Sequence, residues 1–207
     1  MTPSPPSDSA APSSVPGEAA PPKRLIVGIS GASGVMYGVR LLSALRTLPV
    51  ETHLVMSRAA EVTLAHETDL KVAEVRALAD AVHGDSDIAA PPSSGSFRAA
   101  GMIVAPCSMR SLAEIATGAT TTLLTRTADV MLKERRRLVL LVRETPLHSG
   151  HLRNMLTLSE MGAVIAPPVP AFYNNPQSVG DIVDHTVARA LDLFDINSPL
   201  ARRWGED

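Results

Sequence analysis

The stretch RLIVGISGASG, residues 24–34, decides the fold of this chain. Its first part, Leu25–Ile29, is a short apolar run, and its second part, Ser30–Gly34, contains only small residues. A helical pattern follows, up to about Arg46. A continuous apolar run that leads through a tight turn into a helix is typical of a strand in a parallel sheet with both faces covered.

The same unit recurs along the chain. Further apolar runs lie at 52–56, 101–105, 138–142 and 163–166. Helices are predicted at about 58–66, 73–82, 109–117, 122–134, 148–161 and 178–194, with a loop over 89–96. Five strand–helix units predict an α/β fold with a doubly wound parallel sheet in three layers, flavodoxin-like or Rossmann-like. In such folds ligands bind beyond the carboxyl ends of the strands.

Composition narrows the function classes. Hydrophobic residues make up 45% of the 207 residues, which is enough for one well-packed domain. The net charge of -2 gives no reason to expect nucleic acid or an anionic membrane as a partner. No apolar run reaches the roughly 18 residues of a membrane span. Cys107 is the single cysteine, so no internal disulfide can form and a cytoplasmic location is expected.

The first 22 residues differ from the rest. Met1–Pro22 carries seven prolines and almost no large apolar side chains. It also lacks a signal-peptide core and an Arg-rich amphipathic face. Such a segment cannot bury enough surface to order itself, so we expect a disordered tail over 1–22 and a single domain over 23–207.

The first glycine-rich turn is suited to an anionic ligand. Small residues at Gly31–Gly34 let the backbone approach a ligand, and the helix start that follows offers N–H groups to an anion. The spacing of Gly31, Gly34 and Gly38 does not match the dinucleotide-binding fingerprint. A tight turn with Ser33 as a helix cap is the alternative interpretation.

A second turn of this kind is Pro106–Ser111, where a strand ends and a helix begins. Ser108 and Ser111 supply hydroxyl groups and Arg110 supplies a cation, which would suit a phosphate or the edge of a flavin ring. Cys107 is interpreted as a small buried side chain, because a nucleophilic thiol would need a nearby histidine.

Four cations are candidates for holding phosphate: Arg126, Lys133, Arg143 and Arg189. Arg143 directly follows an apolar strand, which places its backbone at the predicted site. Arg135–Arg137 is interpreted as a solvated helix end whose cations face the negative end of the helix dipole.

Two carboxylates could move protons. Glu144 follows Arg143 at a strand end, where a carboxylate stays ionised but can exchange a proton with a neighbouring phosphate. Glu67 ends a predicted helix, an unfavourable place for an acid, so it is held there for another reason or is a surface residue. His148 and His151 are interpreted as structural, because no cysteine or carboxylate completes a metal-ligand spacing with them.

Together these residues resemble the UbiX-type flavin prenyltransferases. The resemblance runs from about Lys23 to the end of the chain. It is carried by RLIVGISGASG, ETHLVMSRAA, HETD, SSGSF, GMIVAPCSM, RTADVMLKERR, LVLLVRETPLH, PPVPAFYNNPQS and the terminal RW.

The resemblance implies that reduced FMN is the prenyl acceptor at N5 and C6, and dimethylallyl monophosphate the donor, without a metal. It also implies a homododecamer with active sites at subunit interfaces. The product, prenylated FMN, would serve partner decarboxylases that act on aromatic or unsaturated acids.

The resemblance further assigns roles to residues. FMN would contact Gly31, Ala32, Ser33, Ser57, Ser108, Met109, Arg110, Ser111, Arg126 and Arg143. Lys133, Arg143, Tyr173 and Arg189 would meet the donor phosphate, and Trp204 would close over the prenyl group. Ser33, expected near flavin N5, would act in catalysis with Lys133, Glu67 and Glu144, the two acids handling protons.

Two other functions fit the sequence less well. An FMN-dependent decarboxylase of cysteinyl substrates would be expected to carry a Pro-x-Met-Asn-x-x-Met stretch, and Val142–Pro146 stands in that region instead. A flavodoxin-like FMN carrier would stack the flavin between aromatic rings, but the chain has few aromatic residues and only Tyr37 lies near the first loop.

Overall fold

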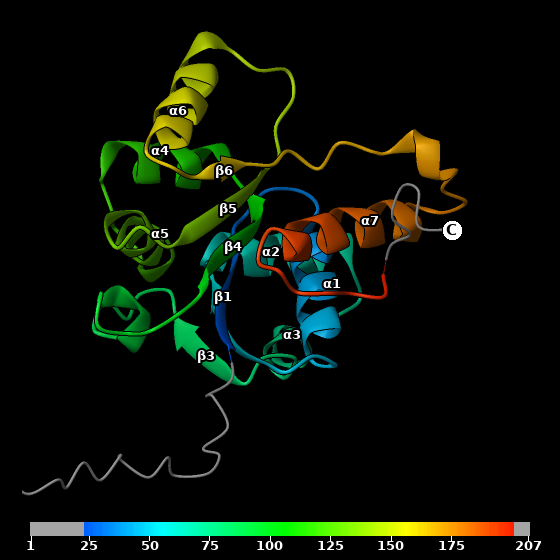
Figure 1. Ribbon diagram of the computed structural model, residues 1–207, viewed down its shortest axis with the longest axis horizontal. Helices are drawn as coiled ribbons and strands as arrows, with labels where there is room; N and C mark the ends of the chain where they lie inside the picture. The colour runs from blue at the N-terminus through cyan, green and yellow to red at the C-terminus, as the bar shows by residue number, and fades with distance from the viewer. Residues whose placement is uncertain (1–22, 201–207) are drawn as a thin grey trace, which may run out of the picture.

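The predicted doubly wound parallel sheet is confirmed in a computed structural model, which describes residues 23–200 (Figure 1). Six parallel strands follow the spatial order β3-β2-β1-β4-β5-β6. The strands are β1 Lys23–Ile29, β2 Val50–Met56, β3 Ala81–Gly84, β4 Gly101–Cys107, β5 Arg137–Val142 and β6 Val164–Ile165.

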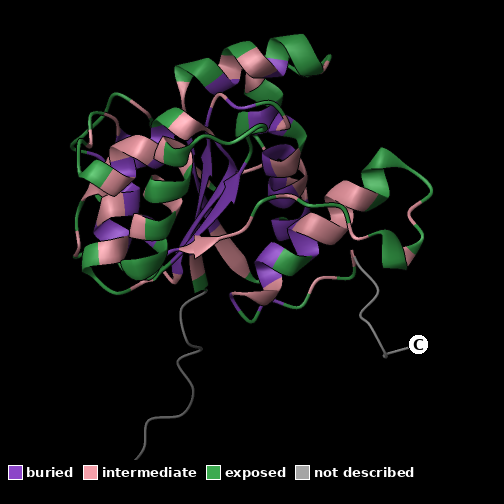
Figure 2. Ribbon diagram, turned by 90° about the horizontal axis from the view of Figure 1, so that it is seen from above, coloured by how far each residue is buried: buried purple, intermediate pink, exposed green. Residues whose placement is uncertain are grey.

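Helices cover both faces of the sheet. They are α1 Val35–Leu45, α2 Arg58–Glu67, α3 Val72–Arg76, α4 Met109–Thr117, α5 Leu123–Lys133, α6 Ser149–Glu160 and α7 Val179–Asp192, with short 3-10 turns at Pro91–Ser93 and Phe172–Asn174. One core cluster joins the sheet to α1, α2, α3 and α7, and the other joins it to α4, α5 and α6. Figure 2 shows the buried strands between these two helical layers.

The helix predicted over 73–82 is wrong. Helix α3 ends at Arg76, and β3 follows as a half-buried edge strand beside β2. Asp80 fixes this arrangement, because its carboxylate accepts hydrogen bonds from the backbone N–H of Thr52 at 2.7 Å and from the Thr52 hydroxyl at 2.8 Å. A four-residue edge strand has too short a pattern to be separated from a helix by periodicity.

A hydrogen-bonded chain of polar side chains crosses β2 and β3. His53, which is buried, lies 2.9 Å from Glu51 through Nε2 and 2.9 Å from His83 Nε2 through Nδ1. The two imidazole rings stack, and the Phe97 ring packs edge-on against His53. Burial and the neighbouring His53 lower the pKa of His83, with Asp87 opposing them.

This lowered pKa predicts that the domain loses stability in mild acid. The unfolded chain, with its ordinary histidine pKa, binds a proton more readily than the folded chain, so unfolding becomes easier as the pH falls below about 6.5. We expect His83→Gln to reduce the loss of melting temperature between pH 7.5 and 5.5. The exposed His66→Gln is the control, and equal pH profiles for His83→Gln and the native chain would contradict the prediction.

Candidate active site

The strand order reverses between β1 and β4, and the edge beyond the carboxyl ends of these two strands is here called the crevice. The chain winds from β1 outward through β2 to β3, then returns to add β4, β5 and β6 on the other side of β1. At such a switch point the loops beyond the two strands diverge and leave room for a ligand. Ser30 joins the two strand ends here, because its hydroxyl donates to the carbonyl of Pro106 and accepts from the N–H of Ser108, both at 2.8 Å.

The turn after β1 requires its glycines. A Cβ on Gly31 would lie 2.4 Å from the Cβ of Ala59 and 3.0 Å from its carbonyl carbon. The loop can therefore run this close to α2 only because residue 31 has no side chain. Gly34 has φ 95° and occupies the N-cap position of α1. Ser33 therefore does not cap the helix, contrary to the alternative interpretation, and stands exposed at the tip of the turn.

The start of helix α1 holds the protein's own carboxylate. Glu67, at the end of α2, accepts hydrogen bonds from the N–H of Gly34 at 2.9 and 3.0 Å and from the N–H of Val35 at 3.0 Å. Burial raises the pKa of Glu67, but the hydrogen bonds from Ser33, Val35 and Gly34, together with the charge of Arg143, bring it below its ordinary value. Glu67 thus replaces the external anion expected at this helix start and fixes Ser33.

We therefore predict that Glu67→Ala destabilises the fold. The substitution leaves the first N–H groups of α1 without their acceptor, and the loss of a helix cap costs about 1 kcal/mol. Urea unfolding should show this loss, whereas Glu160→Ala, at the exposed end of α6, should leave the free energy of unfolding within about 0.5 kcal/mol of the native value. Equal unfolding midpoints for the two variants would show that Glu67 is a simple surface residue.

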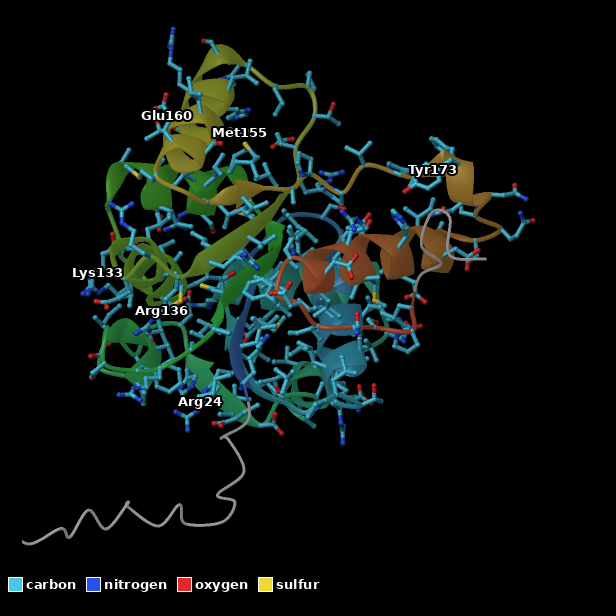
Figure 3. All side chains as sticks on the ribbon, viewed as in Figure 1. Arg24, Lys133, Arg136, Met155, Glu160 and Tyr173 are labelled. Carbon is cyan, nitrogen blue, oxygen red and sulfur yellow. The ribbon has the colours of Figure 1, made fainter. Side chains whose placement is uncertain are left out.

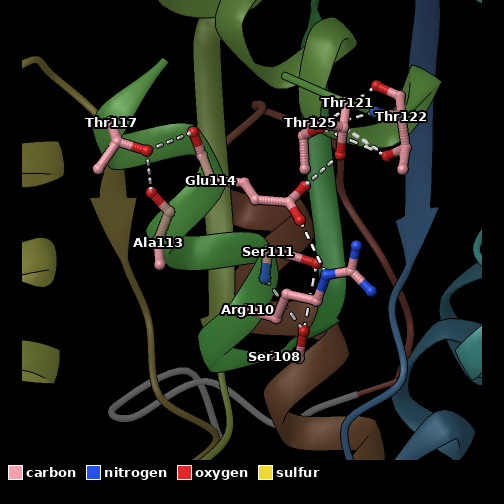
Figure 4. Close-up of polar contacts among 9 residues, drawn as sticks. All are labelled: Ser108, Arg110, Ser111, Ala113, Glu114, Thr117, Thr121, Thr122 and Thr125. Carbon is pink, nitrogen blue, oxygen red and sulfur yellow. Dashed lines mark hydrogen bonds and ion pairs between the residues drawn. The ribbon is translucent and has the colours of Figure 1, made fainter. Parts of the chain in front are cut away.

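Two more helices begin at this edge with serine caps. Ser57 accepts from the N–H of Ala60 at 3.1 Å, and Ser108 accepts from the N–H of Ser111 at 3.3 Å. Figure 4 shows Ser108 and Ser111 close together at the start of α4, with their hydroxyls 3.2 Å apart. The first N–H groups of α2 and α4 have no partner within their helices, which suits these starts to a phosphate or a flavin.

Arg110 does not turn toward this cluster. Its guanidinium is 79% exposed and pairs with Glu114 one helical turn further along, at 2.8 Å (Figure 4). Met109, by contrast, is partly buried against the core on the α4 side of the sheet. Ser108 and Ser111 thus lie at the start of α4 beside the end of β4, Met109 packs against the core, and Arg110 lies on the solvent-facing side of α4.

Arg143 and Glu144 continue the site beyond β5. The N–H of Arg143 donates to the carbonyl of Cys107 at 3.1 Å, which fixes it next to the end of β4. Its charge contributes to the lowered pKa of Glu67 and opposes the rise that burial gives the pKa of Tyr37, so its guanidinium lies near the first loop. Glu144 is exposed, and one of its carboxylate oxygens accepts from the N–H of Thr145 at 2.9 Å.

Sequence reasoning gave no role to two residues at this edge, Tyr37 and Ser30. Burial raises the pKa of Tyr37 despite the opposing charge of Arg143, so its hydroxyl stays protonated beside the site. Tyr37 lies three residues after Gly34, so helical geometry would have placed it on the first turn of α1, facing the same loop. Ser30 was recognised as a strand-end residue, but its bonds to β4 depend on a strand order that the sequence does not reveal.

The interpretation of Cys107 as a buried side chain is confirmed. Its side chain has no exposed surface, and burial raises the pKa of its thiol to about 12. A thiol with this pKa carries almost no thiolate at neutral pH, and thiolate is the nucleophilic form.

Several predicted residues lie away from the crevice. Lys133 ends α5, four residues before β5 begins, and so lies at the amino-terminal edge of the sheet, where it pairs with Glu134 at 2.5 Å. The length of β5 separates it from Arg143 by about 20 Å. Figure 3 shows Lys133 and Tyr173 on opposite sides of the molecule.

Tyr173 and Arg189 belong to the C-terminal part of the described chain. Tyr173 lies on the projecting segment between β6 and α7, 59% exposed, with its hydroxyl 3.4 Å from His185. Arg189 lines a cavity of about 200 Å³ with His185 and Pro167 and pairs with Asp192 at 2.8 Å. Arg126 pairs with Asp129 on α5 at 2.8 Å. Trp204 and the tail over 1–22 lie outside the described residues.

The histidines at the start of α6 stabilise the helix. His148 caps it by accepting from the N–H of Gly150 at 3.0 Å, and its ring packs at a tilt against that of His151 with centroids 3.6 Å apart. Among residues 23–200, no three histidine, cysteine or acidic side chains gather in a way that could hold a metal ion. Within the same part of the chain, no helix is long and apolar enough to cross a bilayer.

Curated proteins of similar sequence include several that are named flavin prenyltransferases. The family model named Flavoprotein matches residues 13–191. A probable UbiX-like flavin prenyltransferase of Streptomyces sp. (strain D7) is 62% identical over 182 residues, which cover 87% of this chain and 91% of that protein. Flavin prenyltransferase UbiX of Escherichia coli (strain K12) is 60% identical over 185 residues, covering 88% and 98%.

Solved structures agree. The crystal structure of AnUbiX (PadA1) in complex with FMN and dimethylallyl pyrophosphate matches with a TM-score of 0.88 and 57% identity, over 90% of this chain and 99% of that one. A dodecameric FMN-dependent UbiX-like decarboxylase from Escherichia coli O157:H7 matches with a TM-score of 0.86 and 56% identity, over 87% and 98%. The cysteine decarboxylase TvaF, at 17% identity and a TM-score of 0.60, shares the fold alone.

Proposed function

This chain belongs to the UbiX-type flavin prenyltransferases, and we propose that it transfers a dimethylallyl group to N5 and C6 of reduced FMN. The observation that carries the proposal is the edge beyond β1 and β4, where Ser30 binds the N–H of Ser108, the N–H of Arg143 binds the end of β4, and Glu67 is affected by both Ser33 and the charge of Arg143. The decarboxylation of cysteinyl substrates is not favoured, because the protein of that activity resembles this chain only in fold.

The crevice suits FMN in its chemistry. The first-turn N–H groups of α2 and α4 that the serine caps leave unbonded, with the hydroxyls of Ser57, Ser108 and Ser111, are donors of the kind that hold phosphate and the polar edge of a flavin. Gly31 lets the turn run close beside α2, and Ser33 is exposed at the tip of the turn, where Glu67 holds it. Bound FMN supplies the nucleophilic nitrogen and carbon that receive the prenyl group.

Fixed cations and a carboxylate serve the chemical step. Breaking the bond between the dimethylallyl carbon and the phosphate oxygen leaves negative charge on the phosphate, which Arg143 is placed to stabilise. Ring closure onto C6 then requires loss of the C6 proton, and Glu144 beside Arg143 is the proposed acceptor. Glu67 is the weaker candidate, because its carboxylate is already bonded to the start of α1.

We further propose that one site is built from more than one copy of the chain. Lys133 cannot reach its own crevice from the other edge of the sheet, and Tyr173 projects outward on an exposed segment. A second copy that presents its Lys133 would complete the phosphate site, and the dodecameric relative has the assembly this requires. Arg126 and Arg189 are further cations for such a shared site.

Three further proposals concern the biological setting. The donor is dimethylallyl monophosphate, although the related crystal structure contains the pyrophosphate. The product is passed to a decarboxylase of aromatic or unsaturated acids that uses prenylated FMN. The enzyme acts in the cytoplasm, consistent with its single, buried thiol.

The test is a direct incubation. We expect the purified protein with reduced FMN and dimethylallyl phosphate to yield a flavin heavier by one prenyl unit in mass spectrometry, with full activity after treatment with a chelator. The pyrophosphate donor in a parallel reaction measures donor preference. An unmodified flavin with both donors would refute the proposed function, and activity that requires an added divalent ion would refute the metal-free mechanism.

A further inference from the structure

A cavity of about 550 Å³ lies at the amino-terminal edge of the sheet, at the other end of the strands from the crevice. It is bordered by the first residues of β1, β5 and β6, namely Lys23, Arg137 and Val164, and by the ends of α5 and α7. Its volume falls in the range of small-molecule sites. Nothing in the proposed prenyl transfer uses this edge apart from Lys133, which does not line the cavity.

The wall of this cavity carries excess positive charge. Lys23, Arg135, Arg136 and Arg137 line it, with Asp195 as the carboxylate. The remaining lining side chains are mostly apolar, including Leu132, Met161, Val164 and Phe194. A concave, partly apolar surface with converging cations is the usual setting for a phosphate-bearing ligand.

Within residues 23–200, two of the four cations already make hydrogen bonds and two do not. The Lys23 ammonium donates to the carbonyl of Phe194 at 2.8 Å. Arg136 donates to the carbonyls of Phe97 and Gly95, at 2.5 and 2.6 Å, and so holds the neighbouring loop (Figure 3 labels it at this edge). In the part of the chain that the structure describes, the guanidinium groups of Arg135 and Arg137 take part in no hydrogen bond or ion pair, although Arg137 lies 5.8 Å from the centroid of the Phe194 ring.

The backbone is strained at two points of the same wall. Arg135 has φ 55° and Asp195 has φ 54°, two of the three non-glycine residues with positive φ in the described part of the chain. This left-handed conformation costs free energy in residues with a side chain, and it is found where the surroundings or a function require it. A solvated helix end, as the sequence indicated for Arg135–Arg137, would more easily end in glycine.

We propose that this cavity binds a small molecule that carries two linked phosphate groups. A single carboxylate or chloride would leave most of the positive charge of the wall unmatched, whereas a diphosphate can engage Arg135, Arg137 and Lys23 together. The apolar side chains beside them would accept the organic part of such a ligand.

Inorganic pyrophosphate is the probe for the test. Because Arg143 at the crevice can also attract phosphate, all titrations use the full chain carrying Arg143→Ala. We expect saturable binding by isothermal titration calorimetry, weakened at least about ten-fold by Arg135→Gly with Arg137→Ala, because each removes a charged contact. Arg153→Ala, an exposed arginine on α6, is the matched control and should leave the affinity unchanged.

The variant design protects the fold. Glycine adopts the φ of Arg135 without strain, so Arg135→Gly removes the charge while it relaxes the backbone, and melting temperatures check this. If Arg137→Ala lowers the melting temperature, Arg135→Gly alone should still weaken binding. The proposal is overturned if the Arg143→Ala protein shows no saturable pyrophosphate binding, if the cavity substitutions leave it unchanged, or if Arg153→Ala weakens it equally.

Discussion

Glu144→Gln is expected to slow prenyl transfer by about 10²-fold or more while FMN remains bound, the usual size of a lost acid–base group. The amide keeps the shape of the side chain, and its oxygen can still accept from the N–H of Thr145, as the carboxylate does at 2.9 Å. It cannot take up the C6 proton. Single-turnover rates at saturating reduced FMN and donor, with flavin binding followed separately, measure both effects.

Arg143→Ala is the contrasting variant. It should weaken ligand binding, since a hydrogen bond to a charged group contributes roughly 1.5–3 kcal/mol. One variant then fails in rate and the other mainly in affinity. If Glu144→Gln turns over at the native rate with saturating substrates, the catalytic role assigned to Glu144 is wrong. The released phosphate would then be the better proton acceptor, because Glu67 is committed to the start of α1.

The part of the site that could be predicted from sequence is the part set by strand ends. Apolar runs that stop at Ser30, Ser57, Cys107 and Arg143 mark one edge of a parallel sheet whatever the strand order, so the crevice residues could be found without a structure. The order itself depends on long-range pairing. The link between Ser30 and Ser108, and β3 beside β2, were therefore outside the reach of local patterns.

For Glu67, the sequence predicts that a partner exists but not which residues form it. Its unfavourable place at a helix end indicated that something else holds it, and the structure supplies the answer in the N–H groups of Gly34 and Val35. The identity of that partner could not be predicted, because it lies more than thirty residues away along the chain. The position of Lys133, by contrast, could be predicted from the sequence. It lies just before the strand that begins at residue 137, and so at the amino-terminal edge of the sheet, away from its own crevice.

Mixed oligomers should regain activity from two impaired variants. If Lys133 of one copy serves the crevice of another, then co-assembled Lys133→Ala and Glu144→Gln chains form some sites with both native residues, about one quarter for random equal mixing in a symmetric assembly. Each variant alone has none. Co-expression with two different affinity tags, followed by purification through both, gives the mixed oligomer for prenyl-transfer assays.

A second mixture tests whether the two residues come from different copies of the chain. Chains with both substitutions, co-assembled with native chains, should have about one quarter of sites intact if the residues come from different copies, and about one half if they come from the same copy. The separation of the two residues by the length of β5 requires the first outcome. The opposite result has two parts: the mixture of the two single variants is no more active than the mean of those variants alone, and the mixture of double-variant and native chains keeps one half of the native activity. This result would place Lys133 and Glu144 in the site of one chain and remove the reason to propose a shared site.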